Sequence, residues 1–270
     1  GGDNGAIRGS PDTAYDGDAS DTERVPFPDN RPVPEIRLSA ADGQGIPRPG
    51  PLELGRGKTL GNMGGGELTD LPIEPAPPDN APGPGVVVLG RFQPVHRGHS
   101  LMIAAANRWR ISNLPDAPLI IAIGSSNRAE SIRNPWSSKE RRSMLEGWLS
   151  SEGISAHLVE IPDIDDPPNW VSHSERYHGK PGVLFTSDPE SAELYESSGW
   201  QVVMADLESR ETFEGWRVRA TAQMMSTVTD ADAVKSVLRA SIPDEVVSYL
   251  MDNDMIRRLA FLGEGGEPVG

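Results

Sequence analysis

The stretch of sequence that decides the fold is Val86-Val-Val-Leu-Gly90-Arg-Phe-Gln-Pro-Val-His96-Arg-Gly98-His99. It runs from a short apolar β-type segment through a glycine to two histidines three residues apart. Residues i and i+3 share one face of a helix, so both imidazoles are expected to point the same way. Backbone N–H groups and the positive end of the helix dipole lie beside them, and Gly98 has no Cβ to keep a phosphate away. The stretch therefore predicts a strand, a turn and a helix start that binds a phosphate-type anion.

A strand-turn-helix unit of this kind typically opens a doubly wound α/β domain, whose ligands bind beyond the carboxyl ends of the strands. Further apolar strand-like runs lie at 119–123, 156–161, 183–185 and 200–204, with helical patterns between them. Beyond residue 215 the pattern is helical only. We therefore expect a Rossmann-like, doubly wound parallel sheet of five strands, followed by C-terminal helices, in a single domain over residues 86–262.

The segment before this domain has a different composition. Residues 1–85 are rich in glycine and proline, show no repeat period and contain few aromatic side chains. Such a segment buries too little apolar surface to offset the entropy lost on ordering. We expect a disordered arm over residues 1–85 and a disordered tail over residues 263–270.

Charge and composition exclude several classes of protein. The net charge of −15 disfavours a general nucleic-acid binder, because such proteins present a basic surface to the phosphate backbone. The chain has no cysteine, and His157, His173 and His178 show no paired ligand spacing, so no metal site of its own is expected. No secretion-signal pattern and no apolar run of about 20 residues is found, which predicts a cytoplasmic protein that binds no membrane.

The longer pattern Gly90-Arg91-Phe92-Gln93-Pro94-x-His96-x-Gly98-His99 resembles the His-x-Gly-His signature of the nucleotidyltransferase superfamily. Its form is similar to that of the archaeal-type nicotinamide mononucleotide adenylyltransferases. The resemblance implies transfer of the adenylyl group of ATP, carried with Mg²⁺, to nicotinamide mononucleotide (NMN), giving NAD and pyrophosphate. It assigns catalysis to His96, His99 and Arg91. The implied ATP-binding residues are Gly90, Arg91, Phe92, His96, Gly98, His99, Arg217 and Arg219.

The same resemblance extends to the segments that would bind the mononucleotide. Ile123-Gly-Ser125 and Asn134-Pro-Trp-Ser-Ser-Lys-Glu-Arg141 are similar to family segments that follow the second strand, and they imply that Arg141 is a phosphate ligand. The family also places an aromatic ring to stack on nicotinamide and an aspartate to bind its carboxamide. By itself, a tryptophan near a strand end is more often part of a core. The implied NMN-binding residues are Gly124, Ser125, Asn134, Arg141, Asp163 and Trp170.

The segment Glu214-Gly-Trp-Arg-Val-Arg219 departs from the family pattern Ser-Gly-Thr-x-Ile-Arg. The glycine, an aliphatic residue and the final arginine are kept, but Glu214 and Trp216 replace two hydroxyl residues. An acid beside a polyphosphate is expected to weaken ATP binding, with Arg217 offsetting part of the effect.

Two other functions remain open at this stage. One is a nucleotidyltransferase that acts on another phosphorylated acceptor, and the other is a non-catalytic nucleotide-binding regulator. The resemblance also implies a homo-oligomer. The sequence leaves open whether nicotinate mononucleotide is accepted.

Overall fold

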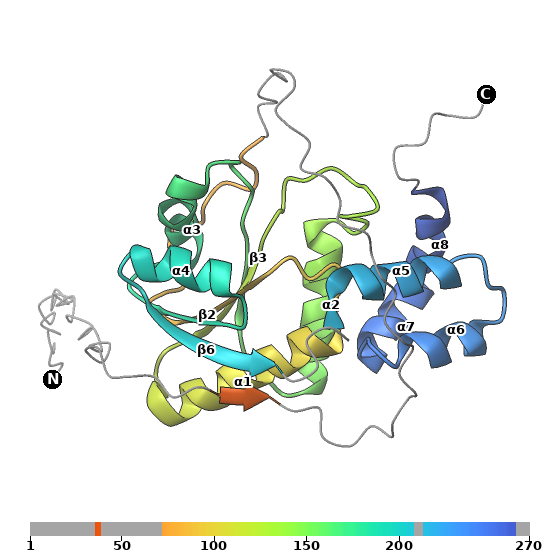
Figure 1. Cartoon of the computed structure of the whole chain (residues 1–270), viewed down its shortest axis with the longest axis horizontal. Helices are drawn as coiled ribbons and strands as arrows, with labels where there is room; N and C mark the ends of the chain where they lie inside the picture. Colours follow the sequence, from red (N-terminus) through yellow and green to blue (C-terminus); the bar gives the residue numbers. More distant parts are fainter. Residues whose placement is uncertain (1–35, 39–71, 208–212, 263–270) are drawn as a thin grey trace, which may run out of the picture.

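The computed structural model describes residues 36–38, 72–207 and 213–262 of the chain. A parallel sheet forms its centre (Figure 1). Its strand order is β1-β6-β5-β2-β3-β4. The strands are β1 (Ile36–Leu38), β2 (Val86–Gly90), β3 (Leu119–Ile123), β4 (His157–Glu160), β5 (Val183–Thr186) and β6 (Gln201–Leu207). The doubly wound parallel sheet and its five expected strands are confirmed.

The sixth strand, β1, corrects the expectation for the N-terminal arm. Residues 36–38 pair in parallel with β6, with Ile36 opposite Ala205. The free edge of a sheet offers unpaired N–H and C=O groups to any nearby segment, and local composition does not reveal such pairing. The rest of residues 1–71 and the expected tail at 263–270 lie outside the described residues.

The sheet is covered by helices on both faces, which explains its continuous apolar strands. Val88 and Ile121 belong to a core cluster with α1 (Arg97–Asn113), α2 (Ser138–Ser151) and the C-terminal helices. Val87 and Ile120 point the other way, into a cluster with α3 (Trp170–His178) and α4 (Pro189–Ser197). Alternate side chains of each strand thus serve opposite cores, as the pleat requires.

The C-terminal helices gather beside α2, away from α3 and α4 (Figure 1). They are α5 (Gly215–Met225), α6 (Ala231–Leu238), α7 (Asp244–Asp252) and α8 (Met255–Arg258). Arg258 forms an ion pair of 2.7 Å with Glu140 at the start of α2. The backbone N–H of Arg97, the first residue of α1, donates to the carbonyl of Ser241 just after α6. These contacts fix the C-terminal helices against α2 and against the start of α1, where His96 and His99 lie.

Residues 72–85 contact the folded part, although we expected the domain to begin at 86. The side chain of Asn127 donates to the Pro72 carbonyl at 3.0 Å, and the Tyr177 hydroxyl donates to the Pro75 carbonyl at 2.9 Å. Gly83 lies so close to the backbone of His178 and Gly179 that a Cβ would meet the His178 carbonyl at 2.4 Å. Residues 72–85 therefore pack against the domain that we expected to begin at residue 86.

Among the helices of the described residues, none combines the length and the apolar character needed to cross a membrane.

Candidate active site

His96 and His99 begin α1 by capping each other. The backbone N–H of His99 donates to Nδ1 of His96 at 3.4 Å, and the N–H of His96 donates to Nδ1 of His99 at 3.3 Å. The two rings stack with their centroids 3.7 Å apart and their planes at 24°. The expectation that both imidazoles share one face of the first turn is confirmed.

The environment keeps both rings neutral. Burial, together with the smaller effect of the positive charge on Arg219, lowers the pKa of His96 to about 4. Burial is also the main reason why the pKa of His99 lies well below its usual range. The neighbouring His96 contributes to this lowering of the pKa, whereas a hydrogen bond to the Pro94 backbone acts to raise it. A neutral ring whose Nδ1 accepts a hydrogen bond carries its proton on Nε2. His96 can therefore donate from Nε2 at pH 7 without carrying a charge.

A cavity of about 400 Å³ lies in front of the histidine pair. It is lined by the carboxyl ends of β2 and β5 and by the starts of α1 and α5. The chain continues in opposite directions across the sheet from these two neighbouring strands, so the cavity lies at the topological switch point. Five of the expected ATP-binding residues line it: Arg91, His96, Gly98, His99 and Arg219.

The other expected ATP-binding residues do not line this cavity. Phe92 is fully buried, and its ring lies 4.7 Å from that of His99, so it supports the histidine from behind. A Cβ on Gly90 would meet the Phe92 ring at 3.0 Å, which shows that this glycine makes room for the ring. Arg217 lies beside Trp216 on the outside of α5.

Two arginines, Arg91 and Arg219, line this cavity, and the charge of a third, Arg133, which no motif in the sequence indicated, acts on Arg219. Burial, followed by the charges of Arg91 and Arg133, lowers the pKa of Arg219 to about 10. Nη1 of Arg219 donates to the Gln93 carbonyl at 3.0 Å, which anchors the side chain. Within the described residues these three arginines form no ion pair with a carboxylate. Their mutual repulsion favours the binding of an anion.

The start of α5 brings further donors to the same cavity. Gly215 begins the helix, and a Cβ there would lie 3.1 Å from Nη1 of Arg219 and 4.0 Å from Nε2 of His96. Glu214 precedes the helix without capping it through its side chain. Its carboxylate instead accepts hydrogen bonds from Nε1 of Trp216 at 2.6 Å and Nε of Arg217 at 3.3 Å. The acid that departs from the family pattern is therefore turned toward its neighbours along the chain.

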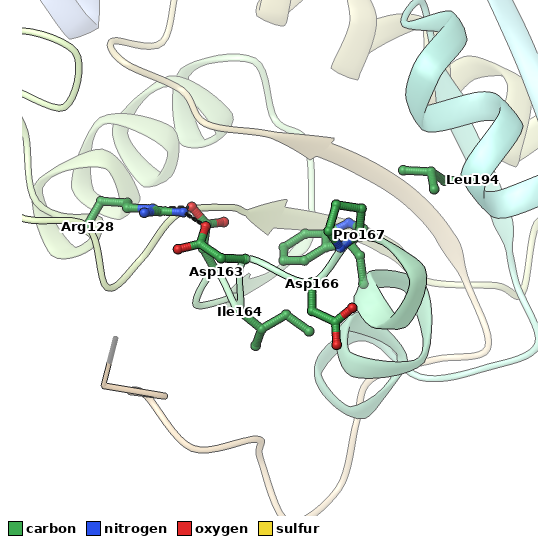
Figure 2. A pocket seen from close by; sticks show the side chains of 8 residues that line it. Arg128, Asp163, Ile164, Asp166, Pro167 and Leu194 are labelled. Atoms are coloured by element: carbon green, nitrogen blue, oxygen red, sulfur yellow. Dashed lines mark hydrogen bonds and ion pairs between the residues drawn. The ribbon is translucent and has the colours of Figure 1, made fainter. Parts of the chain in front are cut away.

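A second cavity, of about 420 Å³, opens beyond the carboxyl end of β4 (Figure 2). Asp163 and Trp170 both line it, as the resemblance implied for an NMN site. Arg128, which no motif in the sequence indicated, forms an ion pair of 2.6 Å with Asp163 and a second ion pair with Asp165. The side chain of Asn127 bonds both the N–H and the carbonyl of Asp163. This network fixes the loop from Asp163 to Trp170 that surrounds the cavity.

The remaining residues of the implied NMN set do not line the second cavity, and three of them, Gly124, Ser125 and Arg141, form a brace at the strand ends. Arg141 is 1% exposed, and burial lowers its pKa to about 10. Its guanidinium donates to the backbone carbonyls of Ser137, Arg91, Gly124 and Ser125 at 2.6–3.2 Å. Asn134 forms a backbone bridge with Ser131 in the adjoining loop. Buried carbonyls at the end of a strand need donors, and Arg141 supplies them.

The described residues contain no group of three or more His, Cys, Asp or Glu side chains that could hold a metal ion.

Comparisons with known proteins match this arrangement. Residues 87–163 fit the family model described as Cytidylyltransferase-like. The chain is 27% identical over 188 residues to the nicotinamide-nucleotide adenylyltransferase of Haloarcula marismortui, an alignment that covers 65% of this chain and 92% of the relative. It is 32% identical over 133 residues to the protein of the same name from Picrophilus torridus, with 49% and 75% covered.

Among solved structures, the chain is similar to a bifunctional NMN adenylyltransferase/ADP ribose pyrophosphatase from Francisella tularensis. The TM-score is 0.47 at 19% identity, and the match covers 66% of this chain and 52% of that chain.

The parallel sheet and the paired histidines at its switch point define a nucleotidyltransferase of the cytidylyltransferase-like class. More narrowly, the chain belongs to the nicotinamide-nucleotide adenylyltransferase family.

Proposed function

We propose that the protein joins ATP and NMN to give NAD and pyrophosphate, with the triphosphate bound in the cavity in front of His96 and His99. The reaction is adenylyl transfer. An oxygen of the NMN phosphate forms a bond to the α-phosphorus of ATP, and the bond from that phosphorus to the leaving pyrophosphate breaks. The observation that carries the proposal is the convergence of His96, Arg219 and the start of α5 on one cavity at the switch point.

The proposed chemistry needs positioning and charge neutralisation more than proton transfer. The phosphate monoester of NMN is already an anion at pH 7, so no side chain has to act as a base. Negative charge in the transition state is spread over phosphoryl oxygens, which fixed donors stabilise best. His96 would donate from Nε2, Arg91 and Arg219 would hold phosphate oxygens, and Arg133 would add positive charge nearby.

Mg²⁺ belongs to this proposal as part of the substrate. It would arrive bound to the polyphosphate of ATP and neutralise part of its charge. We assign no protein ligand to it.

The second cavity is the proposed site of the nicotinamide end of NMN. Trp170 lines it and offers an aromatic face to the pyridine ring, while Asp163 offers oxygens to the carboxamide. Arg128 holds Asp163 in place, so the carboxylate is oriented before the substrate binds. Arg141 would then act indirectly, by keeping the loops from β2 and β3 at the right separation.

The test is a turnover assay with ATP, Mg²⁺ and NMN that measures both NAD and pyrophosphate. The same assay is run with nicotinate mononucleotide, other phosphorylated acceptors, and CTP in place of ATP. Formation of NAD at a kcat/KM above that for every non-pyridine acceptor supports the proposal. If another acceptor has a higher kcat/KM than NMN, that acceptor is the substrate and the proposal is wrong. If no acceptor is turned over with either nucleotide, a regulatory nucleotide-binding protein is favoured instead. A cytoplasmic location and a homo-oligomeric state stay predictions.

A further inference from the structure

Trp216 is an exposed aromatic side chain on the wall of the histidine cavity. It is 54% exposed, at the second position of α5. Other large apolar side chains of the described residues are also exposed, but Trp216 alone among them lines the cavity that contains His96 and His99. Single exposed apolar side chains are common on protein surfaces, so it is the position of Trp216 in the wall of this cavity that indicates a ligand contact.

The indole ring is held in position before any ligand binds. Its Nε1–H donates to the Glu214 carboxylate at 2.6 Å, which limits rotation of the ring. The guanidinium carbon of Arg217 lies 4.7 Å from the ring centroid, so the cation covers one face. Arg217 also donates to Glu214, which ties the three side chains together. A ring fixed in this way loses little further entropy when a flat ligand stacks on its other face.

The groups around Trp216 divide the cavity by chemistry. His96, Arg219 and the N–H groups at the start of α5 suit phosphate oxygens. The side chain of Trp216 has no free donor for a phosphate, since its indole N–H is taken by Glu214. Its π face suits a planar base, and aromatic stacking on a base is one of the stronger contacts in nucleotide recognition.

We propose that Trp216 is the platform on which the adenine base of ATP stacks, with Glu214 and Arg217 as positioning residues that orient its ring. The proposal rests on the proposed function in so far as it takes ATP as the occupant of this cavity. It assigns a base-binding role to the residue that departs most from the family pattern. The triphosphate remains with His96, Arg219 and the helix start.

The experiment compares the binding of ATP with that of inorganic tripolyphosphate, which has the phosphates but no base. Titration calorimetry is done without a mononucleotide on the wild-type protein, Trp216→Ala and Trp216→Phe. We expect Trp216→Ala to bind ATP about 5- to 100-fold more weakly, with tripolyphosphate affinity unchanged within about twofold. Trp216→Phe should keep most of the ATP affinity, because it keeps an aromatic face.

Met224→Ala is the matched control, since it removes another exposed apolar side chain from α5, 71% exposed and outside the cavity wall. It should leave both affinities unchanged. Unchanged ATP affinity in Trp216→Ala, or equal loss of ATP and tripolyphosphate affinity, would overturn the inference. These are binding measurements, so a wild-type protein that binds ATP through Trp216 but forms no NAD would disprove the proposed function and leave the inference standing.

Discussion

His96 accepts a hydrogen bond from the backbone of His99 and donates its own backbone N–H to the His99 ring, so each residue caps α1 for the other. Helix N-caps are normally Ser, Thr, Asp or Asn. Two histidines in this arrangement satisfy the helix start through Nδ1, which leaves Nε2 of His96 as a donor, whereas His99 also bonds the Pro94 backbone. The capping and the proposed catalytic role can therefore be separated by mutation.

We expect His96→Ala to lose both roles. Its free energy of unfolding should fall by about 0.5–2 kcal/mol through loss of the cap. Turnover should fall about 100- to 1000-fold through loss of a donor aimed at developing charge, with a smaller change in the Michaelis constant for ATP. His96→Asn keeps a good cap without the imidazole, so it should lose turnover while its unfolding midpoint stays near the wild-type value. His96→Asn with more than half of wild-type turnover would exclude a catalytic role for this ring.

Trp170→Ala is expected to raise the Michaelis constant for NMN and leave that for ATP nearly unchanged. Trp170 lines only the second of the two cavities described above, and loss of an aromatic platform is worth about 1–3 kcal/mol. Steady-state kinetics with each substrate varied in turn give both constants. Equal increases for the two substrates would mean that Trp170 supports the fold rather than the nicotinamide ring.

Arg141→Met should affect stability more than substrate binding. The guanidinium is buried and donates to four backbone carbonyls, which the substitution would leave without these donors. Unsatisfied buried acceptors cost about 1–3 kcal/mol each before relaxation, so we expect a loss of about 2–5 kcal/mol in the free energy of unfolding. Urea unfolding measures it. A variant of wild-type stability that binds NMN more weakly would instead make Arg141 a direct phosphate ligand.

The stability of the protein should fall between about pH 6.5 and pH 5 because of buried neutral histidines. Burial lowers the pKa of His178 to about 4, and its ring bonds the Tyr195 hydroxyl at 2.9 Å and the Gly179 carbonyl at 2.8 Å. Below pH 6.5 the unfolded state takes up a proton that the folded state does not, so each such histidine contributes a slope of up to roughly 1.4 kcal/mol per pH unit. That contribution is fully present above pH 6.5.

His178→Gln tests this pH dependence, since glutamine keeps a donor and an acceptor but does not titrate. Its free energy of unfolding should fall less steeply than that of the wild type across the same pH range. Glu140 and Glu160 have lowered pKa values, and their stabilisation is lost only as the pH falls through and below the usual carboxylate range. Parallel pH curves for the two proteins would show that His178 is not responsible.

Two truncations distinguish the parts of the N-terminal segment. Removal of residues 1–71 takes away β1 and should leave a folded, active enzyme. Removal of residues 1–84 also deletes three backbone carbonyls that accept hydrogen bonds from the domain. The pairs are Pro72 with Asn127, Glu74 with Ser126, and Pro75 with Tyr177. We expect the longer truncation to lose a further 1–3 kcal/mol or so of stability and to raise the Michaelis constant for NMN, because Asn127 also holds Asp163. If the two truncated proteins have the same stability and the same Michaelis constant for NMN, residues 72–84 contribute neither to stability nor to NMN binding.

The sequence by itself determined the features that depend on neighbours along the chain. The apolar run at 86–89, the glycine and the two histidines predicted a strand, a turn and a helix start because each rests on interactions within a few residues. The cap formed by Ser137 and Glu140 and the cap at Asp188 follow the same short-range chemistry. Continuous apolar strands also predicted a parallel sheet, since only helices on both faces bury them.

Tertiary structure alone decided which distant partners these elements meet. Arg141 bonds carbonyls as far as 50 residues away, Arg128 meets Asp163 across 35 residues, and Arg219 reaches Gln93 across 126. No local periodicity records such pairs, because a long side chain bonds whichever groups the fold brings within reach. The pairing of residues 36–38 with β6 has the same origin. Sequence pattern thus located the histidine pair at the start of α1, whereas packing determined which arginines have no carboxylate partner among the described residues and which hold the loops.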